Sequence, residues 1–326
     1  MLEEFYLNKV EILKKSQEFF INSSSMIPKI GIELEFFLLE KNLQAVENQA
    51  IVADFIAELK AEVLKKIPLI YQIEKEQGAS QIEIKTSFIS DLSNLAFELE
   101  NVKNFVKNFA LNKNFIASFA SQPFLDDCGN ALQFNISLHD KNDKNIFEFD
   151  QKILDNAIAG LLEMTDYMMV FLAPKNEDYK RFSLEVNREL FRRGKFSAPV
   201  NLSFGADNRT CAIRIPSLKK SVRLEYRIAA ADADLFLNIS AILLAMFCGI
   251  ENELNTERLG FTKIFGNAFD DDYKTRSFCG DLEMAKNKFY SEKNFIRDKM
   301  LSFLTIHPAL EHPNYRHPWL AEPRIS

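Results

Sequence analysis

The sequence predicts one α+β domain built on an antiparallel β-sheet, with helices packed against the apolar face of the sheet. In several long segments, apolar side chains recur at steps of three and four, which is typical of amphipathic helices. Between these segments lie short runs in which polar and apolar residues alternate, as they do in strands with one buried face. No repeat, low-complexity tract or flexible linker divides the 326 residues, so a single domain is the simplest interpretation.

Helices are expected in five segments. In the N-terminal segment, Val10, Leu13 and Phe20 mark one face of an amphipathic helix. Ser90 or Asp91 is placed to cap the third helix, because short polar side chains bond the free N–H groups of a first turn. The expected ranges are 1–28, 52–66, 92–109, 150–172 and 232–250.

Strands are expected where residues alternate, or where short apolar runs are bounded by turn residues. A turn containing Gly78 leads into a segment in which Gln81, Glu83 and Lys85 alternate with isoleucines. This turn suggests that Glu76, just before it, faces Glu83. The expected strands are 31–39, 69–73, two strands around a loop within 115–138, 200–204, 210–215 and 222–228.

The composition argues against several classes of protein. A formal net charge of -6 and a pI near 5.5 disfavour nucleic acid as a partner, since binding a phosphate backbone needs a basic surface. No apolar run is long enough to cross a membrane. Four cysteines without a CxxC pair indicate neither a zinc ribbon nor a disulfide framework. A reducing cytoplasm is therefore the expected location.

Glu33 and Glu35 stand two residues apart in the otherwise apolar run 31–39. Because side chains alternate along a strand, both carboxylates leave the same face. From this pair alone, two interpretations stay open: an edge strand with a solvated acidic face, or a metal site.

The pattern recurs on other expected strands. Together they carry five carboxylates and four arginines opposite apolar faces, a set suited to divalent metals and a polyphosphate, because hard oxygen ligands select Mg²⁺ or Mn²⁺ and guanidinium groups offset phosphate charge. The residues are Glu33, Glu35, Glu76, Glu83 and Glu225, with Arg209, Arg214, Arg223 and Arg227.

The order and local sequence of these segments resemble the catalytic domain of the glutamine synthetase family of ATP-dependent carboxylate-amine ligases. The resemblance implies a curved antiparallel sheet with helices on its outer face, covering residues 29–326 after the N-terminal helix at 1–28. Six segments carry it: 31–37 (GIELEFF), 76–84 (EQGASQIEI), 129–138 (GNALQFNISL), 179–182 (YKRF), 208–216 (NRTCAIRIP) and 223–227 (RLEYR).

The resemblance also implies cofactors and roles, with ATP as co-substrate and Mg²⁺ or Mn²⁺ as the metal. Two metal ions would be held, one by Glu35, Glu76 and Glu83 near the acceptor, the other by Glu33, Gln133 and Glu225 near the ATP phosphates. The nucleotide would meet Asn135, Ser137, Arg214 and Arg223. Arg209 and Arg181 would act in catalysis, and Arg181, Arg227 and the backbone at Gly129 would hold the amino acid.

The chain departs from the family pattern in its metal ligands and in its flap. The family has histidines where this chain has Gln133 and Asn135, so either the carboxamide of Gln133 binds metal or it does not. The family also has a flap glutamate where this chain has Ser197. An extra segment, 183–196, precedes that position; Glu185 or Glu189 in it would replace the glutamate, or the segment is a longer surface loop.

Two further departures lie at the ends of the chain. Only about 28 residues precede the first metal strand, so the usual N-terminal β-grasp domain and its catalytic acid are expected to be missing. A homo-oligomer remains possible, but a ring dodecamer is not expected. At the other end, 300–326 is expected to be a tail in which His307, His312 and His317 each precede a proline, docked through Trp319 rather than binding metal.

The leading hypothesis is an ATP- and Mg²⁺-dependent ligase that activates an amino acid carboxylate, most simply the glutamate γ-carboxylate, as an acyl phosphate and joins it to an amine or ammonia. Its substrates would be small molecules. The alternatives are a non-catalytic relative that binds nucleotide or amino acid as a regulator or partner subunit, a phosphotransferase that stops at a phosphorylated acceptor, and a hydrolase using the same metals.

Overall fold

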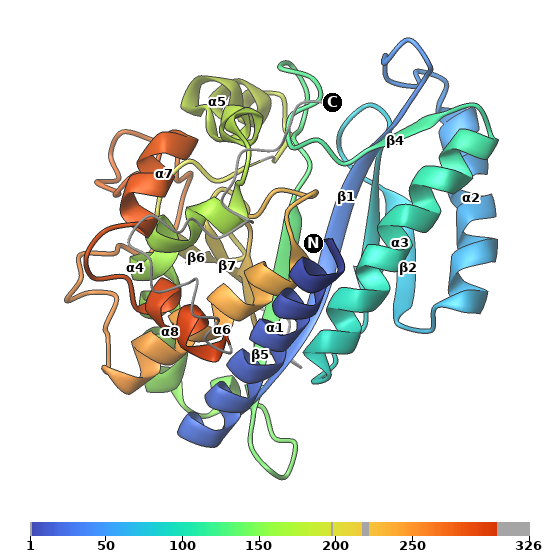
Figure 1. Ribbon diagram of the computed structural model, residues 1–326. Helices are drawn as coiled ribbons and strands as arrows, with labels where there is room; N and C mark the ends of the chain where they lie inside the picture. The colour runs from blue at the N-terminus through green and yellow to red at the C-terminus, as the bar shows by residue number, and fades with distance from the viewer. Residues whose placement is uncertain (1, 197, 217–221, 305–326) are drawn as a thin grey trace.

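The computed structural model describes residues 2–196, 198–216 and 222–304, and it confirms the α+β fold class (Figure 1). Ser197 and the tail residues His307, His312, His317 and Trp319 lie outside this part of the chain. Within it, eight strands form one sheet in the order β2-β3-β1-β5-β8-β7-β6, and β4 pairs with β1. The strands are β1 Ile27–Leu39, β2 Ile70–Lys75, β3 Gln81–Thr86, β4 Ile116–Ser118, β5 Leu132–His139, β6 Phe204–Ala206, β7 Ile213–Ile215 and β8 Leu224–Tyr226.

The five expected helices are present, close to their expected ends. Asp91 caps α3 by accepting a hydrogen bond from the Asn94 N–H, so the second of the two expected caps is used. Three further helices, α5, α7 and α8, were not expected. The helices are α1 Leu2–Ser24, α2 Gln49–Lys66, α3 Leu92–Asn112, α4 Gln151–Leu172, α5 Leu184–Arg192, α6 Leu235–Glu251, α7 Leu282–Phe289 and α8 Phe295–Phe303, with 3₁₀ turns at η1 Ile146–Glu148 and η2 Asn176–Phe182.

The sheet differs from expectation at one edge. All its pairs are antiparallel except β6 with β7, which run parallel, so the sheet is mixed. The strand expected at 200–204 was misplaced: β6 begins at Phe204, and Leu202 instead makes an isolated bridge to Arg276. The strands expected at 210–215 and 222–228 are shorter than predicted, because the sheet includes only the last three residues of the first and the central three of the second.

The helices bury the apolar face of the sheet. Ile32, Leu34 and Phe36 on β1 are at most 1% exposed and belong to the same hydrophobic core as the helices. Two of these helices, α4 and α6, meet at Gly160 and Gly249, where an added Cβ would approach the opposite backbone to 2.3 Å and 2.1 Å respectively. Only glycine allows this approach. The other face of the sheet keeps the polar side chains of the same strands.

Candidate active site

The polar face of the sheet collects most of the predicted site residues. Across the strands, Glu35 stands opposite Glu83, Glu33 opposite Gln133, and Glu225 opposite both Asn135 and Arg214. Paired residues of neighbouring strands lie on the same face, within reach of each other's side chains. Segments as far apart in sequence as 33–35 and 225–227 therefore meet in one polar row.

One half of the row, which we call the arginine half, consists of Glu225, Arg214, Arg227 and Gln133. Glu225 is 1% exposed and sits between two guanidinium groups: its Oε2 accepts from Arg214 at 2.5 Å and its Oε1 accepts from Arg227. Burial opposes ionisation of this carboxylate, but the charges of Arg227 and Arg214 lower its pKa below the usual value. The two arginines of this half thus stabilise the ionised form of Glu225.

Gln133 joins the two halves through both ends of its amide. Its Oε1 accepts from Arg227 at 2.6 Å, and its Nε2 donates to Oε1 of Glu35 at 2.7 Å. The side chain therefore connects a cation and an anion that stand on different strands. For its Oε1 to bind metal, as one of the two expectations has it, the ion would have to share that atom with Arg227.

The other half, which we call the carboxylate half, consists of Glu35, Glu76 and Glu83. Burial, and then the charge of Glu76, raise the pKa of Glu35 to about 7, although the Ala131 N–H bonds its carboxylate. Burial and the nearby charges of Glu33 and Glu35 raise the pKa of Glu83 as well. Burial also raises the pKa of Glu76. Burial is therefore the largest factor that opposes ionisation of these three carboxylates.

Two neighbours of the carboxylate half were not predicted. The residue opposite Glu83 on β2 is Glu74, whereas Glu76 lies beyond the end of β2 and bonds the backbone of Gln81, so the expected pairing of Glu76 with Glu83 is wrong. Lys85 contacts both Glu83, at 2.8 Å, and Glu74, at 2.6 Å. The sequence signal was the alternation along 81–85, which places Lys85 on the face of Glu83.

The predicted metal sites can be tested against this arrangement. Among the residues that the structure describes, no three His, Cys, Asp or Glu side chains converge with metal-binding geometry. The carboxylate half nevertheless offers hard oxygen donors with raised pKa values, a set that a divalent cation would stabilise. In the arginine half, the oxygens of Glu225 and Gln133 already accept from guanidinium groups. The donors of the carboxylate half fit an ion better than those of the arginine half.

Three of the residues predicted to meet the nucleotide continue the row, on β5 and immediately before β8. Arg223 Nε donates to Asn135 Oδ1 at 2.8 Å, and Asn135 Nδ2 donates to Glu33 at 3.0 Å. Ser137 is buried, with its hydroxyl 3.0 Å from Nε2 of His139. Arg209 is exposed, and its charge lowers the pKa of Glu76 against the larger effect of burial, so it lies at the edge of the carboxylate half.

Arg181, predicted to contact the substrate, lies beneath the polar row. The side chain is 1% exposed, and its terminal nitrogens donate to the main-chain carbonyls of Asn130, Ala229, Arg227 and Ile228. It packs on Gly129, where an added Cβ would come within 2.5 Å of Arg181 Cγ. In this conformation Arg181 holds the backbone around Gly129 and Arg227. To bond a substrate directly, Arg181 would have to break some of its hydrogen bonds to these carbonyls.

The segment 183–196 contains helix α5 and packs beside the carboxylate half. Lys195 Nζ contacts Asp127 at 2.5 Å, and the Phe196 N–H donates to Oε1 of Gln77 at 2.6 Å. Glu189 is paired with Arg192 and Arg193 on the same helix, and Glu185 is exposed. In this conformation Glu189 is bound by two arginines, which does not favour it as a replacement for the flap glutamate.

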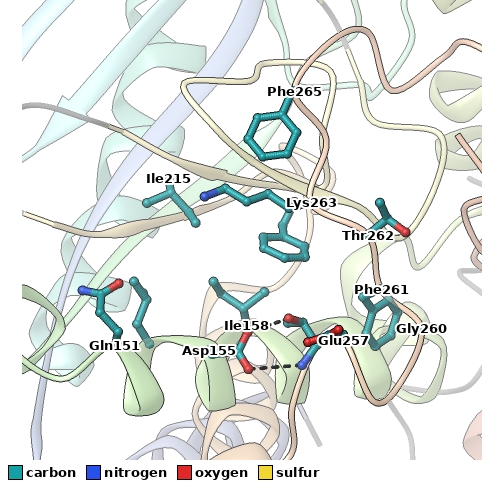
Figure 2. A pocket seen from close by; sticks show the side chains of 13 residues that line it. Gln151, Asp155, Ile158, Ile215, Glu257, Gly260, Phe261, Thr262, Lys263 and Phe265 are labelled. Atoms are coloured by element: carbon teal, nitrogen blue, oxygen red, sulfur yellow. Dashed lines mark hydrogen bonds between the residues drawn. The ribbon is translucent and has the colours of Figure 1, made fainter.

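A cavity of about 560 Å³ is lined by α4, by β6 and β7 near one edge of the sheet, and by the segment 256–265 (Figure 2). Gln151, Asp155 and Ile158 of α4 form one wall, and Lys263 and Phe265 lie across from them. The cavity is lined by none of the predicted site residues, so it is separate from the polar row.

Comparison with known proteins decides the family. The family model for the glutamine synthetase catalytic domain matches residues 44–307. The chain belongs to this family. The fold is also similar to that of a solved structure, a GmaS complex with ADP, which aligns with a TM-score of 0.76 and 21% sequence identity, covering 90% of this chain and 70% of that one.

Three curated relatives carry the names of different ligases. γ-Glutamylputrescine synthetase PuuA of Escherichia coli is 25% identical, over 72% of this chain and 53% of that protein. Glutamine synthetase of Sulfolobus acidocaldarius is 30% identical, over 67% and 47%. Glutamate–methylamine ligase of Methyloversatilis universalis is 28% identical, over 69% and 54%. The chain thus spans about half the length of the curated relatives it matches.

The described helices include none with the length and hydropathy needed to span a membrane.

Proposed function

We propose that this chain is an ATP- and Mg²⁺-dependent ligase that joins an amino acid carboxylate, most simply the γ-carboxylate of glutamate, to an amine or ammonia. The observation that carries the proposal is the polar row itself, in which buried carboxylates with raised pKa values adjoin a series of arginines. Such a row suits phosphoryl transfer, because it offers anchoring for a metal-bound polyphosphate and positive charge for the transferred group.

The proposed reaction has two steps. The substrate carboxylate attacks the γ-phosphorus of ATP, forming an acyl phosphate while the bond to the β-phosphate oxygen breaks and ADP leaves. The amine then attacks the acyl carbon, phosphate leaves, and the nitrogen loses a proton to give the amide. A divalent cation, when bound at the carboxylate half, would offset the charge of the phosphates.

Residues of this chain have distinct parts in the proposal. Arg223 and Arg214, with Asn135 and Ser137, would hold the nucleotide. Arg209, which is exposed at the edge of the carboxylate half, would contact the transferred phosphoryl group. The amino acid would bind where Arg181 fixes the backbone beside Gly129 and Arg227. These placements rest on the family motifs together with the contacts of the polar row.

Amines larger than ammonia are supported as acceptors by two relatives whose names specify putrescine and methylamine. We further infer small-molecule substrates and a reducing cytoplasm. The latter is supported by four cysteines that are all free, three of them buried.

The test is ADP release from ATP and Mg²⁺ with glutamate and a panel of ammonia, methylamine and putrescine. Turnover is expected only with glutamate and at least one amine together. Arg209→Met should lower the rate by about 10²–10³-fold, as removal of a transition-state charge partner does. Lys113→Met, which breaks an exposed ion pair with Glu58 away from the polar row, should leave the rate unchanged. Absence of turnover for every pair would refute the ligase proposal.

One observation favours a second candidate, a non-catalytic relative that binds nucleotide or amino acid. The oxygens of Gln133 and Glu225, expected to bind the nucleotide-side metal, already accept from arginines. Titration calorimetry separates the two functions. Binding of ATP or glutamate without any ADP release would support the non-catalytic protein.

A further inference from the structure

Lys85 places a fixed positive charge inside the carboxylate half. Its Nζ lies 2.8 Å from Oε2 of Glu83 and 2.6 Å from Oε1 of Glu74, and its side chain is 21% exposed. On the adjacent strand its partner is Glu33. One ammonium group therefore sits among three carboxylates, two of which, Glu33 and Glu83, were expected to bind different metal ions.

The ligands expected for the nucleotide-side ion are already engaged by donors of the protein. Glu225 accepts from Arg214 and Arg227, and Gln133 accepts from Arg227 at 2.6 Å. Glu33 accepts from Asn135 Nδ2 at 3.0 Å and faces Lys85 across the strands. A second divalent ion at this position would have to displace these donors, and it would bring two more positive charges beside Lys85 and two arginines.

In the carboxylate half, Lys85 compensates the charge of Glu83, whereas Glu35 is held by a different kind of donor. Glu35 is bonded only by neutral donors among its identified partners: the Ala131 N–H and the amides of Gln81 and Gln133. The contact between Lys85 and Glu83 involves Oε2 alone, and a carboxylate has two oxygens that can accept. Glu83 can therefore share in binding an ion while it stays paired with Lys85.

We propose that Lys85, together with Arg214 and Arg227, takes the place of the nucleotide-side metal ion, so that the free chain binds one divalent cation at Glu35, Glu76 and Glu83 rather than two. The inference rests on the proposed function, which identifies the polar row as the active site. It goes further by stating how many divalent cations this site binds. It makes Lys85 a positioning residue that holds Glu83 and Glu74 and contributes positive charge next to the phosphates.

The number of bound ions tests the proposal directly. Mn²⁺ is titrated into the metal-free chain without nucleotide, and the electron paramagnetic resonance signal of free Mn²⁺ gives the number of strong sites. One site per chain is expected for the wild type. Two strong sites in the wild type would overturn the proposal whatever the variants do.

Variants then test the part of Lys85. Lys85→Met removes the ammonium and should allow a second Mn²⁺ to bind, whereas Lys85→Arg keeps the charge and should bind one. Lys113→Met, a matched loss of an ion-paired lysine on the helical side, should also bind one. A single site of unchanged affinity in Lys85→Met would overturn the role of Lys85. Circular dichroism confirms that each variant is folded, and the wild-type count stands even if Lys85→Met does not fold.

This result is independent of the ligase assay. Because no nucleotide, glutamate or amine is present, the ion count is obtained from active and inactive chains alike. A chain that binds one Mn²⁺ but releases no ADP would refute the ligase proposal and keep the inference. A chain that releases ADP with its substrates but binds two ions strongly would support the ligase proposal and overturn the inference.

Discussion

The two halves of the polar row bury similar carboxylates under opposite electrostatic conditions. In the arginine half, Glu225 lies between Arg214 and Arg227, and its pKa is lowered once their charges outweigh burial. In the carboxylate half, burial and neighbouring carboxylates raise the pKa of Glu35 to about 7 and raise that of Glu83. The comparison shows that arginine charges stabilise the ionised form of the buried Glu225, whereas burial favours the protonated forms of Glu35 and Glu83.

The largest expected effect comes from removing one of the two arginines that contact Glu225. Arg227→Met leaves Glu225 with one guanidinium partner and removes the donor to Gln133 Oε1, so the free energy of unfolding should fall by roughly 3–5 kcal/mol. Urea denaturation measures it. The control, Arg276→Met, breaks a more exposed pair with Glu163 and should cost less than about 1 kcal/mol. Equal losses in the two variants would mean that the buried contacts of Arg227 stabilise the fold no more than an exposed ion pair does.

The next effect is a pH dependence that comes from the carboxylate half. Glu35 has a pKa of about 7 in the folded chain against 4.5 in the unfolded chain, so between these values the folded state binds more protons. The stability of the metal-free chain should therefore rise as pH falls from 8 towards 5, by about 3 kcal/mol at most from this group.

Urea denaturation at pH 8 and pH 5.5 in EDTA measures this slope. Saturating Mg²⁺ should reduce the slope by stabilising the ionised carboxylates at pH 8, and Glu35→Gln should reduce it without metal. If the slope in EDTA matches that in Mg²⁺, the carboxylate half does not hold the cation.

The smallest effect concerns the segment 183–196, which packs beside the carboxylate half, and tests what holds this segment in place. Lys195→Met removes the partly buried contact with Asp127 and should lower global stability by no more than about 1 kcal/mol. Amide hydrogen exchange in α5 should nevertheless quicken, because this contact ties the segment 183–196 to Asp127, which also accepts from the Ala79 N–H. Lys152→Met, at an exposed pair with Glu253, is the control. Unchanged exchange in α5 would show that other contacts hold the segment.

Local sequence signals predicted much of the fold. The long helices were predictable because their apolar period and their caps, such as Asp91, are encoded within each segment. The central strands were predictable for the same reason, since β1 alternates between carboxylates and apolar residues along one short run. The site residues on β1, β3, β5, β7 and β8 could be placed on one face from that alternation alone.

What the sequence did not show depends on partners far along the chain. β6 begins at Phe204 because its parallel partner β7 and the bridge of Leu202 to Arg276 fix where pairing starts. Likewise, nothing within 81–85 reveals that Lys85 contacts Glu74, because that contact depends on how β2 aligns with β3. The bonds at both ends of the Gln133 amide depend in the same way on β1 and on Arg227.

The alternation on β1 also governs how the sheet assembles. Ile32 and Leu34 face the helices, while Glu33 and Glu35 stand on the polar row. If β1 slipped by one residue against β3 or β5, both carboxylates would enter the hydrophobic core and the apolar side chains would leave it. Misaligned sheets are thus disfavoured during folding, because the two glutamates let β1 pair in only one register without burying their charge in the core.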